Sequence, residues 1–492
     1  MEDDPEKLFQ TTLDADGVLV ATLDMPGRTM NVFSAGLMDA LDALMSRVEQ
    51  DPAVRSVVIT SGKPSFLAGA DLSMVRGYTE QARTATPAQM FETCGRLGRQ
   101  FVRLEACAKP WVAAVNGIAL GGGLELALAC RQRLVADDPK LQLGVPEVRW
   151  GLLPGAGGTQ RLPRMAPFDA AMRCLLTGAS MTPAQALQWG VVDAVLPAAD
   201  LLAAAIAASR ALQGRPYDAQ AKFKRLSQTE LPPHSDATAR ALAARHGVDS
   251  ERFDQYPAYS AICDSVLQGA HLPLAEATAL EMHQFLRLMF SPVAGRMIHT
   301  LFLERLRAER ELAAPAGLQI ERITHGPISD ARRAWRDALI RLKVPQSEDG
   351  ALGADVLELH DNRGQRHQLA LRMLDETPAA ATMATAVLAP AGPYGRVLEL
   401  VGTRPAQAQA QAAAALAAKL WCLPWPTPGP LSALQSLRGL PLAQQAQAAQ
   451  ALSARPGAGD PVFLDVAACL AGIAPAWSGG PLSWAASQVT PA

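Results

Sequence analysis

The sequence predicts an α/β protein between residues 10 and 200, and two observations carry this prediction. Apolar runs of strand length alternate with segments in which apolar residues recur at helical spacing. Strands that alternate with helices form parallel β-α-β units with right-handed crossovers. Two glycine-rich segments, 116–126 and 144–160, lie in the same part, and each places one glutamate beside its glycines. Glycines allow a ligand to approach backbone N–H groups, so these segments indicate a binding site.

Local signals predict the individual elements. Ser34 is the expected N-cap of a helix that runs through Val48, because apolar residues repeat at helical spacing after it. Met25-Pro26-Gly27 ends the strand before this helix. The remaining elements predicted here are strands at residues 17–23, 54–60 and 110–119 and a helix at residues 124–130.

The later part of the chain has a different pattern. Residues 201–312 are predicted to form a mostly helical linker, and we interpret the Met/Leu stripe within 258–311 as core packing against the first domain. Residues 313–492 are predicted to form a small α/β or α region. Its expected elements are strands at 354–359 and 397–401, helices at 406–419 and 444–454, and a proline-rich loop at 424–430.

The bulk composition excludes several classes of protein. A net charge of −2 gives no electrostatic basis for binding nucleic acid or an anionic membrane. No uncharged apolar run is long enough for a transmembrane segment, and the acidic first residues do not resemble a secretory signal. The seven cysteines are scattered and never spaced as a metal site. We therefore expect a cytoplasmic protein with reduced thiols and no bound metal.

Two glycine-containing turns can supply N–H donors for a developing oxyanion. Gly121-Gly122-Gly123 enters a helix, where N–H groups are free and the dipole is positive. Ala68-Gly69-Ala70-Asp71 follows a strand and can supply a second donor. The structural alternatives are that the glycines only permit close strand–helix packing, and that Asp71 only caps an ordinary turn.

Each glutamate has a catalytic and a structural interpretation. Glu125 lies in the first turn of its helix, where the dipole favours the carboxylate form and hence a base. Glu147 follows a proline in a loop at a strand end. Two carboxylates on neighbouring loops can divide proton transfer between water and carbon. A single glutamate in a first turn is usually only dipole compensation, and either glutamate alone is more often structural than catalytic. The loop at 155–161 is not a P-loop, because no Gly-Lys-Ser/Thr follows.

Together these motifs resemble the crotonase (enoyl-CoA hydratase/isomerase) superfamily. Four segments occur in the order of that family, at residues 25–31, 68–71, 121–125 and 146–161. The resemblance is most specific to the α subunits of multifunctional fatty-acid oxidation enzymes. It implies a crotonase-type ββα spiral domain at residues 10–200, the helical linker at 201–312, and a degenerate 3-hydroxyacyl-CoA dehydrogenase-like region at 313–492.

The resemblance implies an enoyl-CoA hydratase of fatty-acid β-oxidation. The N–H groups of Ala70 and Gly122 would form the oxyanion hole for the thioester oxygen. Glu125 would activate water and Glu147 would handle the α-proton. The substrate-binding residues implied by the resemblance are Ala68, Leu72, Gly121 and Gly155.

The dehydrogenase part of the resemblance fails at its two functional motifs. No GxGxxG occurs in the chain, and the strand expected to precede it begins near Leu318. Without these glycines a pyrophosphate cannot lie against the helix N-terminus. The position of the family's catalytic histidine is Ala386. We therefore expect no cofactor: NAD binding is lost, and the coenzyme A thioester is the substrate.

Two alternatives stay open beside the hydratase. The same glutamates support Δ3-Δ2 enoyl-CoA isomerisation, as a side activity or as the main one. The altered C-terminal region is also compatible with a non-catalytic or partner-dependent scaffold subunit of a thiolase-containing complex. The expected partners are an acyl-CoA substrate and a thiolase subunit, within an oligomer.

Overall fold

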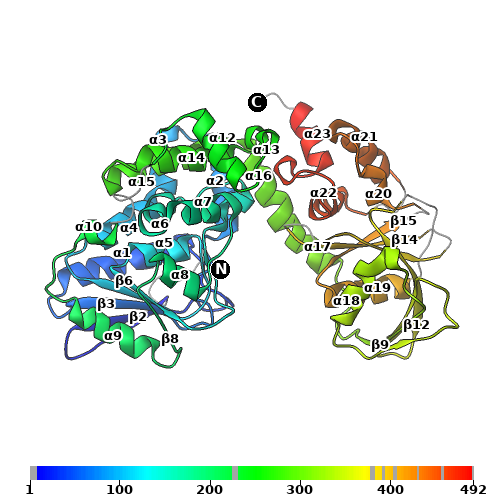
Figure 1. Ribbon diagram of the computed structural model, residues 1–492, viewed down its shortest axis with the longest axis horizontal. Helices are drawn as coiled ribbons and strands as arrows, with labels where there is room; N and C mark the ends of the chain where they lie inside the picture. The colour runs from blue at the N-terminus through cyan, green and yellow to red at the C-terminus, as the bar shows by residue number, and fades with distance from the viewer. Residues whose placement is uncertain are drawn as a thin grey trace. The chain divides into compact units, whose positions relative to one another are not determined.

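The computed structural model describes residues 8–223, 231–376, 383–390, 394–402, 407–428, 431–455 and 459–489 (Figure 1). Its contacts divide the chain into two compact units, Met1–Gly295 and Arg296–Ala492. Each unit has its own sheet and its own helices. None of the helices in the described ranges combines the length and the apolar character needed to cross a membrane.

The first unit contains a six-stranded sheet in the order β1-β2-β3-β4-β6-β8. Only the β1–β2 pair is antiparallel, and each later pair is parallel. The parallel sheet confirms the predicted α/β class. A second sheet pairs β5 with β7 and so joins the two glycine-rich segments. The strands are β1 Phe9–Leu13, β2 Val18–Leu23, β3 Ser56–Ser61, β4 Trp111–Val115, β5 Ala119–Leu120, β6 Gln132–Ala136, β7 Leu143–Gly144 and β8 Ala194–Leu196.

Helices cover both faces of the six-stranded sheet. On one face α9 packs across β2, β3, β4 and β6, and on the other α5 packs on β4 and β6. Ser34 caps α1 as predicted, because its side chain accepts from Leu37 N–H. The helices up to this point are α1 Ala35–Gln50, α2 Leu72–Gln81, α3 Pro87–Cys94, α4 Arg96–Ala106, α5 Gly122–Ala129, the 3₁₀ turn η2 Pro146–Trp150, α6 Gly158–Met165, α7 Phe168–Thr177, α8 Pro183–Trp189 and α9 Leu201–Ala211.

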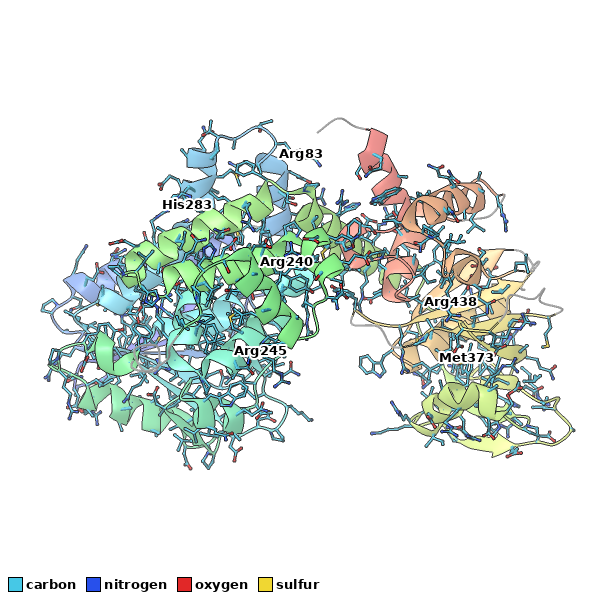
Figure 2. The ribbon with its side chains drawn as sticks, turned by 45° about the horizontal axis from the view of Figure 1, so that its top comes forward. Arg83, Arg240, Arg245, His283, Met373 and Arg438 are labelled. Carbon is cyan, nitrogen blue, oxygen red and sulfur yellow. The ribbon has the colours of Figure 1, made fainter. Side chains whose placement is uncertain are left out.

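A further helical layer packs on this α/β core. Helix α14 contacts α6, and α15 contacts α3, α4 and α6. The ring of His283, labelled on α15 in Figure 2, lies 4.8 Å from the ring of Phe91 on α3. The apolar residues of α14 and α15 therefore pack into the core of the first unit, as predicted for this part of the stripe. The helices of this layer are α10 Ala219–Lys222, α12 Asp236–Arg245, α13 Ser250–Gln255, α14 Pro257–Gly269, α15 Leu274–Met289 and α16 Pro292–Ile298.

The second unit is also α/β, so the α alternative for this region is wrong. Its seven-stranded sheet has the order β10-β9-β11-β12-β13-β14-β15, with parallel and antiparallel neighbours mixed. Helix α19 packs on β9, β12, β14 and β15. The strands are β9 Ile320–His325, β10 Gln346–Glu348, β11 Val356–Asp361, β12 Arg366–Met373, β13 Thr385–Leu388, β14 Val397–Gly402 and β15 Leu423–Pro428. The helices are the π turn η3 His299–Glu304, α17 Arg305–Glu311, η4 Asp330–Arg332, α18 Arg333–Ile340, α19 Gln407–Lys419, α20 Ala433–Leu437, α21 Leu442–Ser453, α22 Pro461–Leu470, η5 Ala476–Ser478 and α23 Pro481–Val489.

The proline-rich loop predicted at residues 424–430 is wrong for its described part. Residues 423–428 form β15, which pairs with β14 in parallel register. Pro424, Pro426 and Pro428 alternate along this strand, which lies at the edge of its sheet. Proline is tolerated there because its missing N–H faces away from the neighbouring strand. Residues 429–430 lie outside the described residues.

Candidate active site

Glu125 joins the two glycine-rich segments. It lies in the first turn of α5 and is only 2% exposed. Its Oε1 accepts hydrogen bonds from the N–H groups of Ala156, at 2.8 Å, and Gly158, at 2.7 Å. Because Oε1 accepts both of these bonds, Oε2 is left to take a proton. The carboxylate is thus held in one orientation by the turn at residues 156–158.

The environment of Glu125 tunes its acidity. Burial raises the pKa of Glu125 to about 7, while the two N–H groups and the charge of Arg161 act in the opposite direction. Arg161 is itself buried and donates to Ala156 O at 3.0 Å and to Glu105 at 3.0 Å. The Ala156 peptide group is therefore held from both sides, by Glu125 at its N–H and by Arg161 at its carbonyl.

Glu147 lies in η2 with its carboxylate against Gly121. A Cβ at Gly121 would collide with Glu147 Oε1, and Gly121 has φ +52°, so glycine is required there for two reasons. Glu147 Oε2 is buried and has no hydrogen-bond partner in the described part of the chain. Burial, followed by the charge of Glu125, raises the pKa of Glu147 well above its usual range. This carboxyl is poised to carry a proton.

The two predicted oxyanion-hole donors lie on adjacent turns. Gly122 is the first residue of α5, so its N–H has no intrahelical acceptor. Around Ala70, Phe33 N–H donates to Gly69 O and Asp71 N–H donates to Phe33 O. Within the described ranges the N–H groups of Ala70 and Gly122 donate no hydrogen bond. A Cβ on Gly69 would lie 3.2 Å from the carbonyl oxygen of Leu120, so the two turns are packed together.

The other predicted substrate residues flank these donors. Ala68 N–H donates to Asn31 O at 2.9 Å, which anchors the start of the turn. Leu72 is the first residue of α2, whose N-cap is Asp71. Gly155 borders an apolar cavity of about 270 Å³ between α4 and α15. Gly121 is in contact with Glu147, as described above.

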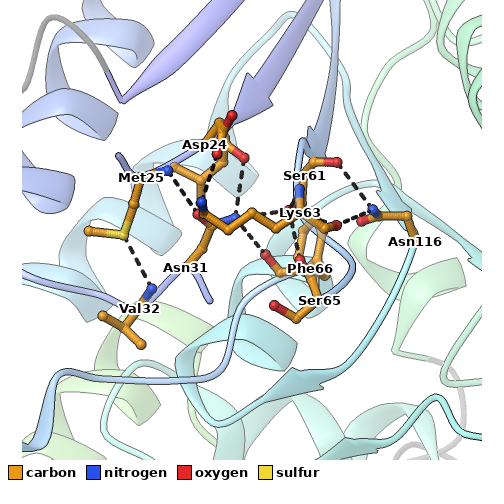
Figure 3. A network of polar contacts seen from close by, with 10 residues as sticks. Asp24, Met25, Asn31, Val32, Ser61, Lys63, Ser65, Phe66 and Asn116 are labelled. Atoms are coloured by element: carbon orange, nitrogen blue, oxygen red, sulfur yellow. Dashed lines mark hydrogen bonds and ion pairs between the residues drawn. The ribbon is translucent and has the colours of Figure 1, made fainter. Parts of the chain in front are cut away.

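A polar network, with Asn31 buried at its centre, fixes the loop at residues 61–66, which leads into the Ala70 turn (Figure 3). Asn31 is fully buried, accepts from Met25 N–H at 3.0 Å and donates to Ser61 Oγ at 2.9 Å and to Phe66 O at 3.2 Å. Asn116 adds bonds to Ser61 O and Lys63 O. The segment at residues 25–31 therefore supports the site indirectly, through the loop that carries the Ala70 donor.

Replacing Asn31 with alanine is expected to lower the free energy of unfolding by about 3 kcal/mol, because several buried polar groups lose their partner at once. Urea unfolding of the variant measures this loss. The matched control is Asp24→Asn, which breaks only the partly exposed ion pair with Lys63 at 2.8 Å. It should cost less than about 1 kcal/mol. Equal stabilities of the two variants would contradict the role assigned to Asn31.

One buried carboxylate at the site was not predicted from the sequence. Glu281 of α15 is fully buried and contacts the same turn as Glu125. It lies inside the Met/Leu stripe, between Ala277 and Met282 on the inward face of the helix. A single acidic residue on an otherwise apolar face was the signal that could have identified it.

Comparisons with known proteins relate the first part of the chain to one family. The enoyl-CoA hydratase/isomerase family model matches residues 14–256. Fatty acid oxidation complex subunit alpha of Shewanella putrefaciens is 37% identical over 310 residues, which cover 63% of this chain and 43% of that protein. The corresponding subunit of Shewanella halifaxensis is 37% identical over 315 residues, with the same coverage. The chain thus spans less than half the length of these curated relatives.

Solved structures with similarity to the chain include an enoyl-CoA hydratase from Geobacillus kaustophilus, at 25% identity and a TM-score of 0.38, covering 61% of this chain and 94% of that one. They also include human mitochondrial Δ3-Δ2-enoyl-CoA isomerase, at 23% identity and a TM-score of 0.43, covering 62% and 100%. The sequence motifs and the family match agree on one assignment for the first unit. Residues 14–256, just under half of the chain, match as an enoyl-CoA hydratase/isomerase domain, a domain of the crotonase family.

Proposed function

We propose that the protein is an enoyl-CoA hydratase that adds water across the α,β double bond of 2-trans-enoyl-CoA in fatty-acid β-oxidation. The observation that supports this most is the pairing of Glu125 and Glu147 in unlike environments. Glu125 accepts two N–H bonds on one oxygen, while Glu147 has a buried oxygen without a partner. Two carboxyl groups held in this way can hold opposite protonation states at one pH.

The proposed reaction starts with the thioester. Its carbonyl oxygen would accept hydrogen bonds from Ala70 and Gly122 N–H, which stabilise the negative charge that builds as the enolate forms. Each such donor is worth about 3–4 kcal/mol in the transition state. The close contact between the two turns supports this role, because it keeps the two N–H groups in a fixed arrangement.

Proton transfer would then be divided between the glutamates. Ionised Glu125 removes a proton from water through Oε2, and the oxygen of that water bonds to Cβ of the substrate. Protonated Glu147 delivers its proton to Cα, and the electrons of the double bond form the new C–H bond. The product is a 3-hydroxyacyl-CoA. The two carboxyl groups finish with exchanged protonation states and are reset by proton exchange with solvent.

The proposed division of roles predicts a bell-shaped pH dependence of kcat/KM for hydration. Activity should fall as pH drops through about 7, because burial raises the pKa of Glu125 to about 7 and the base must be ionised. Activity should fall again at higher pH, where Glu147 loses the proton that it must donate. Initial rates across the pH range check both limbs. A profile that rises toward low pH would contradict the assignment of Glu125 as the base.

The direct test is the loss of the conjugated 2-enoyl-CoA absorbance with crotonyl-, octenoyl- and hexadecenoyl-CoA. We expect turnover on at least one chain length, with 3-hydroxyacyl-CoA as the product. Supplying NAD in the same reaction should produce no NADH. If no chain length turns over, the hydratase proposal is wrong. Turnover that appears only on adding a thiolase would favour the partner-dependent scaffold subunit.

Isomerisation is the second activity that the site supports. Moving a double bond from Δ3 to Δ2 also passes through an enolate held by the oxyanion hole, and it needs only a group that removes and returns protons. Incubation with 3-enoyl-CoA separates the two activities: accumulation of 2-enoyl-CoA without hydration would make the protein an isomerase.

We further propose that the second unit does not bind NAD. After β9 the chain continues through Gly326 and Pro327, and a Cβ at Gly326 would collide with the carbonyl oxygen of Gly353. That glycine is therefore explained by chain packing, and a proline supplies no N–H to a phosphate. The position corresponding to the family's histidine, Ala386, is buried in β13.

We also propose a thiolase partner and a cytoplasmic location for the protein. The seven free cysteines agree with a reducing compartment.

A further inference from the structure

Four consecutive backbone N–H groups at the start of α6 bind two different carboxylates in alternation. Those of Ala156 and Gly158 donate to Glu125, as described above. Those of Gly157 and Thr159 donate to Glu281, at 2.5 and 2.8 Å. The turn is thus held between a carboxylate from α5 and a carboxylate from α15.

Glu281 accepts more hydrogen bonds from this turn than Glu125 does. Its Oε1 accepts from Gly157 N–H, and its Oε2 accepts from both the N–H and the hydroxyl of Thr159. The Thr159 hydroxyl also lies 2.7 Å from Ser265 Oγ of α14, and Gln160 donates to Ser265 O at 2.8 Å. Helices α14 and α15 therefore fix the turn through a fully buried polar network.

Burying the carboxylate of Glu281 costs free energy that an apolar residue in the same place would not cost. It is fully buried on the apolar face of α15, beside Thr278, Met282 and Phe285. Removing a carboxylate from water is unfavourable by several kcal/mol, and well-packed apolar residues often serve stability as well or better. A buried carboxylate that contacts the catalytic turn is therefore best explained by what it does to that turn.

We propose that Glu281 is a positioning residue for the reaction: it holds the N–H groups of residues 156–159 in the one arrangement that orients the carboxylate of Glu125. The proposal rests on the proposed hydratase function and assigns part of the catalytic arrangement to α15, which lies outside the 14–256 match to the family model. Glu281 need not touch the substrate, because it acts through the peptide groups that it shares with Glu125. A displacement of the base by about 1 Å is enough to reduce a rate about 100-fold.

Substitution by glutamine is expected to have different effects on the turn at Glu125 and at Glu281. At Glu125 one oxygen accepts both N–H bonds, so a glutamine carbonyl can replace it with no bond lost. At Glu281 each oxygen accepts from a backbone N–H, so a glutamine must direct its own NH₂ against one of them. Glu281→Gln should therefore shift the turn even though the side chains have nearly equal volume.

The charge of Glu281 gives a second readout. The charged groups around the turn come from α4, α5, η2 and α6: Glu105, Glu125, Glu147 and Arg161. Burial, followed by the charge of Glu125, raises the pKa of Glu281 to about 8. The charge of Glu281 in turn raises the pKa of Glu147. Removing the charge of Glu281 should therefore move the alkaline limb of the pH profile, which reports Glu147, toward lower pH.

The experiment compares Glu281→Gln with wild type and with Glu276→Gln, which removes an exposed carboxylate from the same helix. We expect Glu281→Gln to lower kcat roughly 10- to 100-fold with KM changed less than about 3-fold, and to shift the alkaline pH limb to lower pH. Glu276→Gln should keep wild-type kinetics. Glu281→Asp keeps the charge on a shorter side chain, so it should retain the wild-type pH limbs while losing kcat.

Three outcomes overturn the inference. One is wild-type kcat and pH limbs in a folded Glu281→Gln protein. Another is a loss of thermal stability alone, with kinetic constants unchanged at low temperature. The third is an equal effect of Glu276→Gln. Failure of the hydratase proposal is recognised separately, because wild type itself would then show no turnover on any 2-enoyl-CoA.

Discussion

Replacing Glu125 with glutamine is expected to reduce kcat for hydration about 1,000-fold while leaving the fold intact. The amide keeps one oxygen, and one oxygen accepts both hydrogen bonds, from Ala156 and Gly158. The NH₂ group takes the place of Oε2 and cannot accept a proton from water. The variant therefore removes the base without disturbing the turn. Steady-state kinetics on the best 2-enoyl-CoA, together with thermal unfolding, measure the two effects separately.

Glu147→Gln is the matched partner of this variant. It should also abolish hydration, but its effect on stability differs in sign from that of an ordinary core mutation. Burial raises the pKa of Glu147 in the folded protein. The free energy of unfolding therefore falls as pH rises above the pKa that this group has in the unfolded chain. A neutral glutamine should therefore raise the unfolding temperature at alkaline pH. Retention of hydratase activity in either variant would contradict the division of roles.

The first unit was largely predictable, because its signals are local. Helical spacing and the cap at Ser34 predicted α1, and the run at residues 54–60 predicted β3. The glycines at residues 121–123 marked the start of α5, because only a residue without a side chain fits where Gly121 meets Glu147. The family motifs then identified both glutamates. Their catalytic roles remain predictions that the variants above test.

The contacts between distant segments were not predictable. Glu281 lies 122 residues from Thr159 in sequence, and no local pattern relates the two. The Glu105–Arg161 pair joins α4 to α6 in the same way. In the second unit, β15 was predicted as a loop because its prolines usually exclude a strand. Proline is tolerated in a strand at the edge of a sheet. Whether a strand lies at the edge depends on the topology of the whole sheet, which no local sequence pattern shows.

Removing one N–H from the oxyanion hole is expected to reduce kcat about 100- to 1,000-fold. Gly122 is the first residue of α5, the helix position at which proline is best tolerated. Gly122→Pro therefore deletes the donor while preserving the helix. A side chain at this position also approaches the ring of Phe33, since a Cβ would lie 2.9 Å from it. Gly122→Ala carries the same Cβ and keeps its N–H, so it is the control for this contact.

The ratio of kcat between the alanine and proline variants separates the replacement of the N–H by the proline ring from the contact of the added Cβ with Phe33. Both variants should unfold at similar temperatures, and KM should change less than kcat, because the donor binds charge that develops only in the transition state. A proline variant that keeps the kcat of the alanine variant would remove Gly122 from the oxyanion hole. Catalysis would then rest on the Ala70 turn and the two glutamates, and the position of the thioester would have to be reassigned.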